Sequence, residues 1–345
     1  MGDLKRLARQ LLAGGVYRSG LFALRMRFLA RRHSLVLMYH RILPRDSVGP
    51  FLQPGMYVEP ATFERHLLFL KKYFQVWPAE ALYAGHVADA AQIPGRPACA
   101  LTFDDGWADF YTHAFPLLVK HQVPALVFLP TGFIGTGRRF WTERLGRICA
   151  SAMLRGSFAA LQEFVRSKLH LTEAVATTNI AFQDQLIQCL KAYRLVDIEA
   201  LLRQLESLFA DISSDTGRDF LNWKEIEEMQ HSGLVTFGAH TENHQLLNTL
   251  SVNEISRELV NSKQALLEHC ADVSSALSFC YPNGNYTASA IVELGRNGYL
   301  CAFCTRNGWN DHATPCFELR RVGVHQDIAA SDSLFAYRIF SAAVD

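Results

Sequence analysis

Seven short runs of apolar or β-branched residues, each about as long as a β-strand, recur along the 345 residues of this chain. Helical patterns, with apolar residues three and four positions apart, separate most of these runs. Strands that alternate with helices lie parallel in one sheet, because each helix returns the chain to the same edge. The pattern predicts an α/β fold, and the repeat favours a distorted (β/α)7-type barrel. The runs cover Ser34 to Tyr39, Ala98 to Phe103, Pro124 to Leu129, Leu234 to Phe237, Leu277 to Tyr281, Tyr299 to Cys304 and Leu319 to Val324.

Residues able to carry chemistry come directly after these predicted strands. In a barrel of this kind the loops after the carboxyl ends of the strands form the active site. We therefore expect the following residues to converge on one face: His40, Asp104, Asp105, His240, the turn Pro282 to Gly284, and His325. The clearest helical patterns between the strands cover Pro60 to Phe74, Trp223 to Gln230, Val252 to Cys270 and Ala288 to Asn297.

Residues 140–220 interrupt the alternation, because they contain helical patterns and no clear strand. We interpret them as a helical insertion, with helices at Phe158 to Leu169 and Val196 to Phe209. The insertion follows the loop after a strand, so it is expected on the catalytic side as a lid or wall. It divides the predicted barrel into residues 34–139 and 221–345.

The N-terminal segment, residues 1–33, is basic and amphipathic. Its Lys and Arg residues alternate with leucines and phenylalanines, and its one acid is Asp3. This pattern is typical of a helix on an anionic membrane surface, and equally of a helix that packs on its own domain. The basic residues are Lys5, Arg6, Arg9, Arg18, Arg25, Arg27, Arg31 and Arg32.

Composition narrows the class of protein. A net charge of +1, with 49% hydrophobic and 19% charged residues, indicates a globular protein and does not favour nucleic acid as a partner. The eight cysteines lie singly in apolar segments, so reduced, buried thiols are expected, including Cys301 and Cys304 of a lone CxxC. No run reaches membrane-spanning length, and the first thirty residues lack the apolar centre of a signal peptide. The prediction is a cytoplasmic protein, with membrane association as an option through its N-terminus.

Two adjacent carboxylates, Asp104 and Asp105, stand where an apolar strand meets a glycine turn, in the run Leu101 to Trp107. Because the backbone turns there, both side chains can reach one pocket from different directions, one to hold a metal and the other to move protons. The alternative is an Asp-Gly turn that caps the next helix.

His240 closes another predicted strand, and His244 follows four residues later. Two neutral imidazoles and a carboxylate make a three-ligand site that leaves a position open for water, as catalytic zinc requires. A pair of histidines four residues apart also occurs on surfaces and at helix caps.

Together these motifs resemble those of the NodB-type polysaccharide deacetylases, carbohydrate esterases of family four. That family has TFDDG, here Thr102 to Gly106, and H-[ST]-x-x-H, here His240 to His244. A third motif, an aromatic-Pro-x-Gly turn after a strand, matches Phe279 to Gly284. The resemblance spans roughly residues 35 to 325, and the opening Met-Tyr-His-Arg run is similar to the branch associated with exopolysaccharide and surface-glycan synthesis.

The resemblance implies roles for individual residues. Asp104 corresponds to the catalytic base, and Asp105, His240 and His244 correspond to ligands of a divalent metal, usually zinc. The turn made by Tyr281, Pro282, Asn283 and Gly284 lines the substrate site, with a backbone N–H, most nearly that of Asn283, directed at the oxyanion.

The chain departs from the family pattern at two places. Cys280 stands where an arginine pairs with the base, and Arg321 and Arg41 are the candidates to replace that arginine. His325 matches only loosely the histidine that supplies the general acid, and the aspartate that tunes this histidine has no clear counterpart. His40 is the competing acid; it either lines the site or packs in the barrel mouth.

Aromatic residues offer faces for stacking on sugar rings, or else serve the structure. The candidates are Trp141, which we include in the substrate site, Trp107 and Tyr286.

The function expected from these features is metal-dependent removal of an N-acetyl group from an amino sugar. The substrate would be an N-acetylated polysaccharide or a lipid-linked saccharide precursor. Two alternatives stay open: a deformylase or other amidase that uses the same metal site, and a catalytically silent glycan-binding module.

Overall fold

The computed structural model describes residues 2–30, 32–49, 52–53, 55–83, 93–170, 179–209, 217–270 and 277–344. The chain divides into two compact units. The barrel unit comprises Met1–Pro44, Gly55–Thr136 and Phe220–Asp345, and the helical unit comprises Arg45–Pro54 and Gly137–Asp219.

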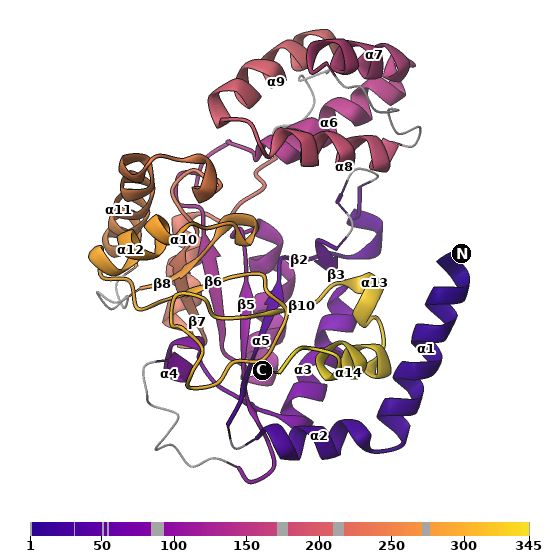
Figure 1. The fold of residues 1–345 in the computed structure, drawn as a ribbon, viewed down its shortest axis with the longest axis vertical. Coiled ribbons are helices and arrows are strands. Elements are labelled where there is room, and N and C mark those ends of the chain that lie inside the picture. Colours follow the sequence, from indigo (N-terminus) through magenta and orange to yellow (C-terminus); the bar gives the residue numbers. More distant parts are fainter. Residues whose placement is uncertain are drawn as a thin grey trace. The chain divides into compact units, whose positions relative to one another are not determined.

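A curled sheet of parallel strands forms the centre of the barrel unit (Figure 1). All seven predicted strands are present, in the order β10-β1-β5-β6-β7-β8-β9, which confirms the α/β fold with a half-barrel sheet. The strands are β1 (Ser34–Tyr39), β5 (Ala98–Phe103), β6 (Ala125–Leu129), β7 (Val235–Ala239), β8 (Ser278–Cys280), β9 (Cys301–Phe303) and β10 (Val322–Gly323). A short strand, β4 (Gln75–Val76), extends this sheet beside β5, and β2 (Arg41–Ile42) pairs with β3 (Tyr57–Val58) separately.

One segment near the C-terminus contacts both edges of the curled sheet. The amide of Leu319 donates to the carbonyl of Ala302, and the amide of Cys304 donates back to Leu319. A few residues later, Val322 and Gly323 pair with β1. We call residues 319–324 the seam segment, because it joins the first strand of the sheet to the last; Arg321 lies between its two sets of contacts.

Helices cover the sheet where the sequence predicts them, and capping boxes mark the starts of two of them. Asn222 and Glu225 form a capping box at the first turn of α10, and Ser251 and Glu254 form another at α11, which satisfies amides that lack partners within the helix. The helices of the barrel unit are α1 (Gly2–Arg18), α2 (Leu21–Leu29), α3 (Pro60–Tyr73), α4 (Ala79–Tyr83), α5 (Phe115–His121), α10 (Trp223–His231), α11 (Val252–His269), α12 (Ala288–Arg296), α13 (Gln326–Ala329) and α14 (Asp332–Phe340).

The helical unit has its own apolar core, built by inward-facing leucine, isoleucine and phenylalanine side chains of its four longer helices. Its elements are α6 (Trp141–Leu154), α7 (Phe158–Lys168), α8 (Asn179–Leu190) and α9 (Leu195–Phe209). The expected role of residues 140–220 as a lid over the site stays a prediction.

The eight cysteines are all free, and most are buried as expected. Cys316 is the clear exception. It is exposed, because it lies in a turn outside the sheet rather than in an apolar strand. Among the described residues, no helix combines the length and the hydropathy that a membrane crossing requires.

His66, on α3, is a buried histidine held in its neutral form. One ring nitrogen, Nε2, lies 2.8 Å from the carbonyl oxygen of Ala329, and Nδ1 lies 3.2 Å from the hydroxyl of Tyr39. The ring stacks on Phe335 with 3.9 Å between centroids. Nε2–H therefore donates to the carbonyl and Nδ1 accepts from the tyrosine. Burial lowers the pKa of His66 to about 4, because a charged imidazolium would be poorly solvated there.

Because His66 is buried in its neutral form, we predict that the free energy of unfolding decreases as the pH is lowered. In the unfolded chain His66 binds a proton near its usual pKa of 6.5, whereas in the folded chain it does so only near pH 4. The unfolded state therefore binds more protons between these values, and the gap corresponds to about 3 kcal/mol of unfolding free energy lost by pH 4. Denaturant unfolding of the native protein and His66→Gln, at intervals between about pH 4 and 7, measures it.

Replacing the exposed His312 by Gln is the matched control, and it should leave the slope unchanged. An equally steep loss of stability in the His66→Gln variant would contradict the assignment.

Candidate metal centre and active site

Three loops after the carboxyl ends of β5, β7 and β8 carry the candidate site, and all have strained backbones. Six non-glycine residues among those described have positive φ angles, and four lie in these loops. Such conformations persist where surrounding contacts enforce them, and they concentrate at functional sites. The four residues are Asp105, Thr241, His244 and Asn283.

Gly106 explains why the first loop can turn so sharply. Its φ is +62°, and a Cβ atom there would lie 2.7 Å from Cδ2 of Leu129, so only glycine fits. The Asp-Gly turn expected from the sequence is thus present. Its two carboxylates bond to histidine, arginine and tryptophan side chains rather than to helix amides.

Asp105, His240 and His244 come together as a three-ligand cluster. Oδ1 of Asp105 lies 3.4 Å from Nε2 of His240 and 3.2 Å from Nε2 of His244. Around a tetrahedral zinc with bonds of about 2.0–2.1 Å, ligand atoms are separated by about 3.3 Å, so the cluster fits such an ion. Asp105 and His240 are buried, while the His244 side chain is 21% exposed, so the cluster is accessible from the His244 side.

Neighbouring groups orient these ligands. Nδ1 of His240 lies 2.7 Å from the carbonyl oxygen of Cys280, so Nδ1 carries the proton and Nε2 is left to bind a cation. The indole N–H of Trp107 donates to Oδ2 of Asp105 at 3.0 Å. Burial alone would raise the pKa of Asp105, but the two imidazoles hold it well below its usual range. Burial lowers the pKa of His244, which favours the neutral, metal-binding form.

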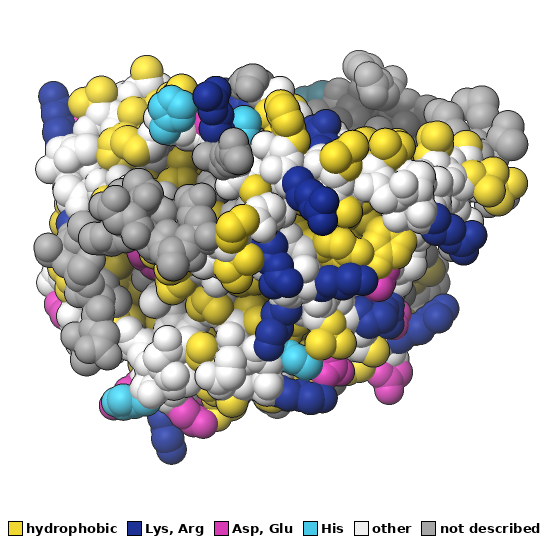
Figure 2. Space-filling view, turned by 90° about the horizontal axis from the view of Figure 1, so that it is seen from below, with side chains coloured by type: hydrophobic (Ala, Val, Ile, Leu, Met, Phe, Trp, Pro, Cys, Tyr) yellow, Lys and Arg dark blue, Asp and Glu magenta, His cyan; other side chains and the backbone are white. Residues whose placement is uncertain are grey.

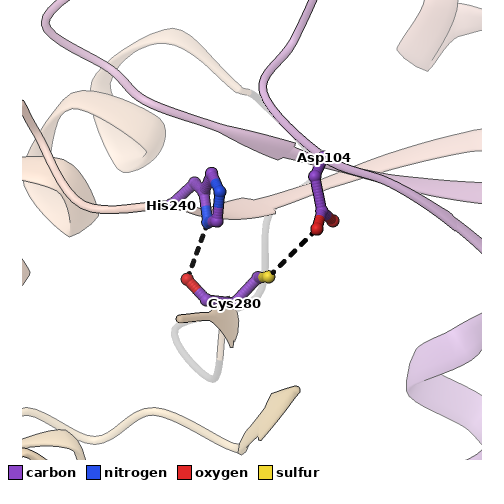
Figure 3. Close-up of side chains that lie close together, drawn as sticks. All are labelled: Asp104, His240 and Cys280. Carbon is purple, nitrogen blue, oxygen red and sulfur yellow. Dashed lines mark hydrogen bonds between the residues drawn. The ribbon is translucent and has the colours of Figure 1, made fainter. Parts of the chain in front are cut away.

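A second cluster of possible ligands, Asp104, His240 and Cys280 (Figure 3), shares His240 with the first. A guanidinium nitrogen of Arg321 lies 2.8 Å from Oδ2 of Asp104 and 3.0 Å from Sγ of Cys280, so a positive charge already occupies this position. Burial also raises the pKa of the Cys280 thiol, which keeps it protonated. The Asp105 cluster is therefore the candidate metal centre.

Asp104 forms a buried, two-pronged ion pair with Arg321. The two guanidinium nitrogens lie 2.6 and 2.8 Å from the two carboxylate oxygens. Burial raises the pKa of Asp104, but the charge and hydrogen bonds of Arg321 outweigh this, and the pKa lies below its usual value. Arg321 thus takes the position that the missing arginine of the third motif leaves open.

Arg41, the other candidate partner of Asp104, forms an ion pair with a different carboxylate. It pairs with Asp109 at 2.8 Å, and its guanidinium lies over the Trp107 ring, 4.4 Å from the centroid. Asp109 also accepts a hydrogen bond from the amide of Ile42. These contacts tie the loop after β1 to the loop after β5. No sequence motif marks Asp109, so its contacts are apparent only in the folded chain.

The two candidate acids lie on neighbouring strands. Nε2 of His40 is 4.0 Å from Oδ2 of Asp104, so His40 lines the site. His325 follows β10, whose register with β1 places it beside His40 at the same sheet edge. Nδ1 of His325 lies 3.3 Å from Oδ2 of Asp327, an aspartate that the sequence analysis did not assign. Burial lowers the pKa of His325.

The aromatic residues considered for substrate binding make structural contacts, and their role towards a sugar stays a prediction. Tyr281 is buried, donates its hydroxyl to the carbonyl of Phe317 and stacks on Tyr286. Trp107 is buried against Phe220, so its face is covered. Trp141 begins α6 and packs on the core of the helical unit.

The rest of the third-motif turn combines a buried proline, Pro282, with the exposed Asn283. Gly284 has a φ of +74°, and a Cβ atom there would collide with Thr305. This position therefore requires glycine.

A buried carboxylate on α11 holds the loop that carries His244. Glu258 accepts hydrogen bonds from the amide and side chain of Asn243, at 2.8 and 2.9 Å, and from Gln245 at 2.8 Å. The two donors flank His244, whose φ is +54°. Glu258 therefore secures a strained backbone at a candidate metal ligand, although it does not contact the cluster itself.

This network predicts that Glu258→Gln lowers the affinity for a divalent metal by about 10–100-fold, the range typical of lost outer contacts at metal sites. The amide presents N–H groups to donors, so at least one bond to the loop is lost. Titration with zinc against a chelator measures the affinity. Glu268→Gln, on the exposed side of the same helix, is the matched control; equal affinities in both variants would contradict the role of Glu258.

Comparisons with known proteins agree with this geometry. A family model described as polysaccharide deacetylase matches residues 91–302. YxkH of Bacillus subtilis, provisionally named as a polysaccharide deacetylase, is 21% identical over 86% of this chain and 73% of its own length.

Solved structures share the fold. The deacetylase PplD of Streptococcus pyogenes, in complex with acetate, superposes with a TM-score of 0.56 at 19% identity, covering 88% of this chain and 97% of its own. IcaB of Ammonifex degensii gives 0.55 at 20% identity, covering 89% and 98%. The family match extends over more than half of the chain and includes the Asp104 and His240 motifs. The chain therefore belongs to the polysaccharide deacetylase family.

Proposed function

We propose that this protein is a metal-dependent hydrolase that removes an N-acetyl group from an amino sugar. The observation that carries the proposal is the pairing of a three-ligand cluster, Asp105, His240 and His244, with a separate ionised carboxylate, Asp104, on the adjacent residue. A hydrolase of this kind needs both a site for a Lewis acid and a base that is not itself a ligand. The buried Arg321 keeps Asp104 ionised for that purpose.

The residues of the chain divide the work as follows. A divalent metal held by the cluster would supply the Lewis acidity that activates water and polarises an acetamide carbonyl. Asp104 accepts the proton of the attacking water. The donor set of one carboxylate and two imidazoles suits zinc. The backbone of the third-motif turn, at Asn283, is the proposed donor to the oxyanion.

His325 is the proposed proton donor to the departing amine. Its Nδ1 faces Asp327, which leaves Nε2 to carry the proton that the amine receives, as in other histidines oriented by a carboxylate. His40 contacts the same carboxylate as Arg321 and would instead position the base. A His325→Gln variant that kept full turnover, beside an inactive His40→Gln, would assign the acid to His40.

The proposed substrate is an N-acetylated polysaccharide or a lipid-linked saccharide of exopolysaccharide synthesis, modified in the cytoplasm. Family membership supports the substrate class, and the acetate bound to PplD supports the acyl group. Parallel assays of acetate and formate release from N-acetylated and N-formylated amino-sugar oligomers test the acyl group. Formate release alone would overturn the proposal in favour of a deformylase, and location is tested by cell fractionation.

The division of labour predicts different outcomes for two substitutions. Asp104→Asn should keep the bound metal and lose turnover by about 100-fold or more, because the base is lost while the cluster is intact. His240→Ala should lose both metal and turnover. Metal analysis of the purified variants and acetate release measure the two properties. Full acetate release by Asp104→Asn would refute the assignment of the base.

The Arg321 pair predicts a shift in the pH profile. Activity requires ionised Asp104, so it is lost as the pH falls through the pKa of this residue. Arg321→Lys keeps one positive charge but loses the two-pronged bond, so the pKa of Asp104 rises and the acid limb of kcat/KM moves to higher pH. Arg306→Lys, at an exposed ion pair with Glu318, is the control that should leave the limb in place. An unchanged limb in Arg321→Lys would count against the pair as the group that sets the pKa.

A further inference from the structure

Helices α1 and α2 expose large apolar side chains that nothing in the described chain covers. On α1 these are Leu7, Leu11 and Leu12, and on α2 they are Leu21, Leu24 and Phe28. Their exposed fractions range from 50% for Leu21 to 82% for Phe28. We call this set the N-terminal face. Single exposed leucines are ordinary on protein surfaces, whereas six on two consecutive helices form a patch that calls for a partner.

The opposite sides of the same helices are anchored in the barrel unit. Phe22 packs against Phe69 and Tyr73 of α3, with 5.3 and 5.2 Å between centroids. Arg25 donates to the carbonyl of Ala342 at 3.2 Å and lies over the Phe340 ring. Both helices are therefore fixed to the domain by one side, and residues of the N-terminal face contribute little to the fold.

Positive charge surrounds the N-terminal face. From Leu4 to Arg45 the sequence has ten Lys or Arg residues and no Asp or Glu. Arg18, Arg27 and Arg32 are exposed on or directly after the two helices. Figure 2 shows Lys and Arg side chains gathered on the face seen from below, with hydrophobic side chains between them and few acids.

We propose that the N-terminal face docks the protein onto an anionic membrane surface. Leucine and phenylalanine side chains enter the boundary between headgroups and acyl chains, and arginines beside them bind lipid phosphates. A second copy of the chain is a poorer partner, because a symmetric contact would place the same arginines opposite one another. The charge of the surface therefore selects a lipid partner over a copy of itself.

Docking is separate from the proposed chemistry. Helix α2 precedes the amino end of β1, whereas the metal cluster follows the carboxyl ends of β5 and β7. Because the strands are parallel, these are opposite ends of the sheet. The inference therefore does not rest on the proposed function, and the two are tested with different variants.

The test measures sedimentation of the full chain with lipid vesicles. The protein should bind phosphatidylcholine vesicles that contain phosphatidylglycerol and should bind pure phosphatidylcholine vesicles at least tenfold more weakly. Binding should also weaken as salt is added, because screening removes the attraction of exposed arginines. The double variant Leu24→Ser/Phe28→Ser should bind at least tenfold more weakly. Arg18→Gln/Arg27→Gln should bind about 25-fold more weakly, since each arginine contributes about fivefold near such a surface.

Leu267→Ser/Val292→Ser is the control, because these apolar residues are also exposed but lie on α11 and α12. It should bind vesicles as the native protein does, and circular dichroism confirms that each variant is folded. Failure of the native protein to bind anionic vesicles at low salt would overturn the proposal, and so would equal binding by Leu24→Ser/Phe28→Ser. A native dimer that becomes monomeric in that variant, without vesicle binding, would show that a second copy covers the face.

Discussion

The buried ion pair between Asp104 and Arg321 is the interaction on which the site depends most. Both side chains are almost fully removed from solvent, so neither charge is tolerable alone. Arg321 also donates hydrogen bonds to the hydroxyl of Thr102 and the carbonyl of Cys304, so its guanidinium group has partners besides Asp104. Loss of one partner would leave a buried charge unpaired, at a cost of about 3–5 kcal/mol. The pair thus joins β5 to the seam segment and also keeps the Asp104 carboxylate ionised.

The same pair limits the strength of Asp104 as the proposed base. An arginine at 2.6–2.8 Å stabilises the carboxylate, so Asp104 is always ready to accept a proton but holds it weakly. A weak base is sufficient where a bound metal lowers the pKa of water, because the base then needs little affinity for the proton. Cys280 completes the arrangement, since its small thiol leaves room for an arginine that arrives from a different strand.

Most of the barrel could be predicted from the sequence because its signals are local. Each strand is a short apolar run, and each predicted metal ligand belongs to a motif contained within five residues. The sequence could not show whether Arg321 or Arg41 pairs with Asp104, because the answer depends on which strands become neighbours when the sheet curls. Glu258 and Asp327 could not be predicted for a similar reason. Glu258 binds the loop that carries His244, and Asp327 contacts His325, but neither belongs to a sequence motif.

The seam segment is synthesised long after the strand that carries Asp104. Asp104 precedes Arg321 by 217 residues, and β1 lacks one neighbour until β10 has been made. During synthesis from the N-terminus, the pocket residues of β5 therefore exist for most of the chain's length without their counterion. A ribosome-bound fragment that ends before the seam segment carries the candidate metal-ligand motifs, but its proposed base, Asp104, still lacks the arginine that keeps it ionised. The proposed base therefore gains its counterion only after the seam segment has been made, later in synthesis than every predicted metal ligand.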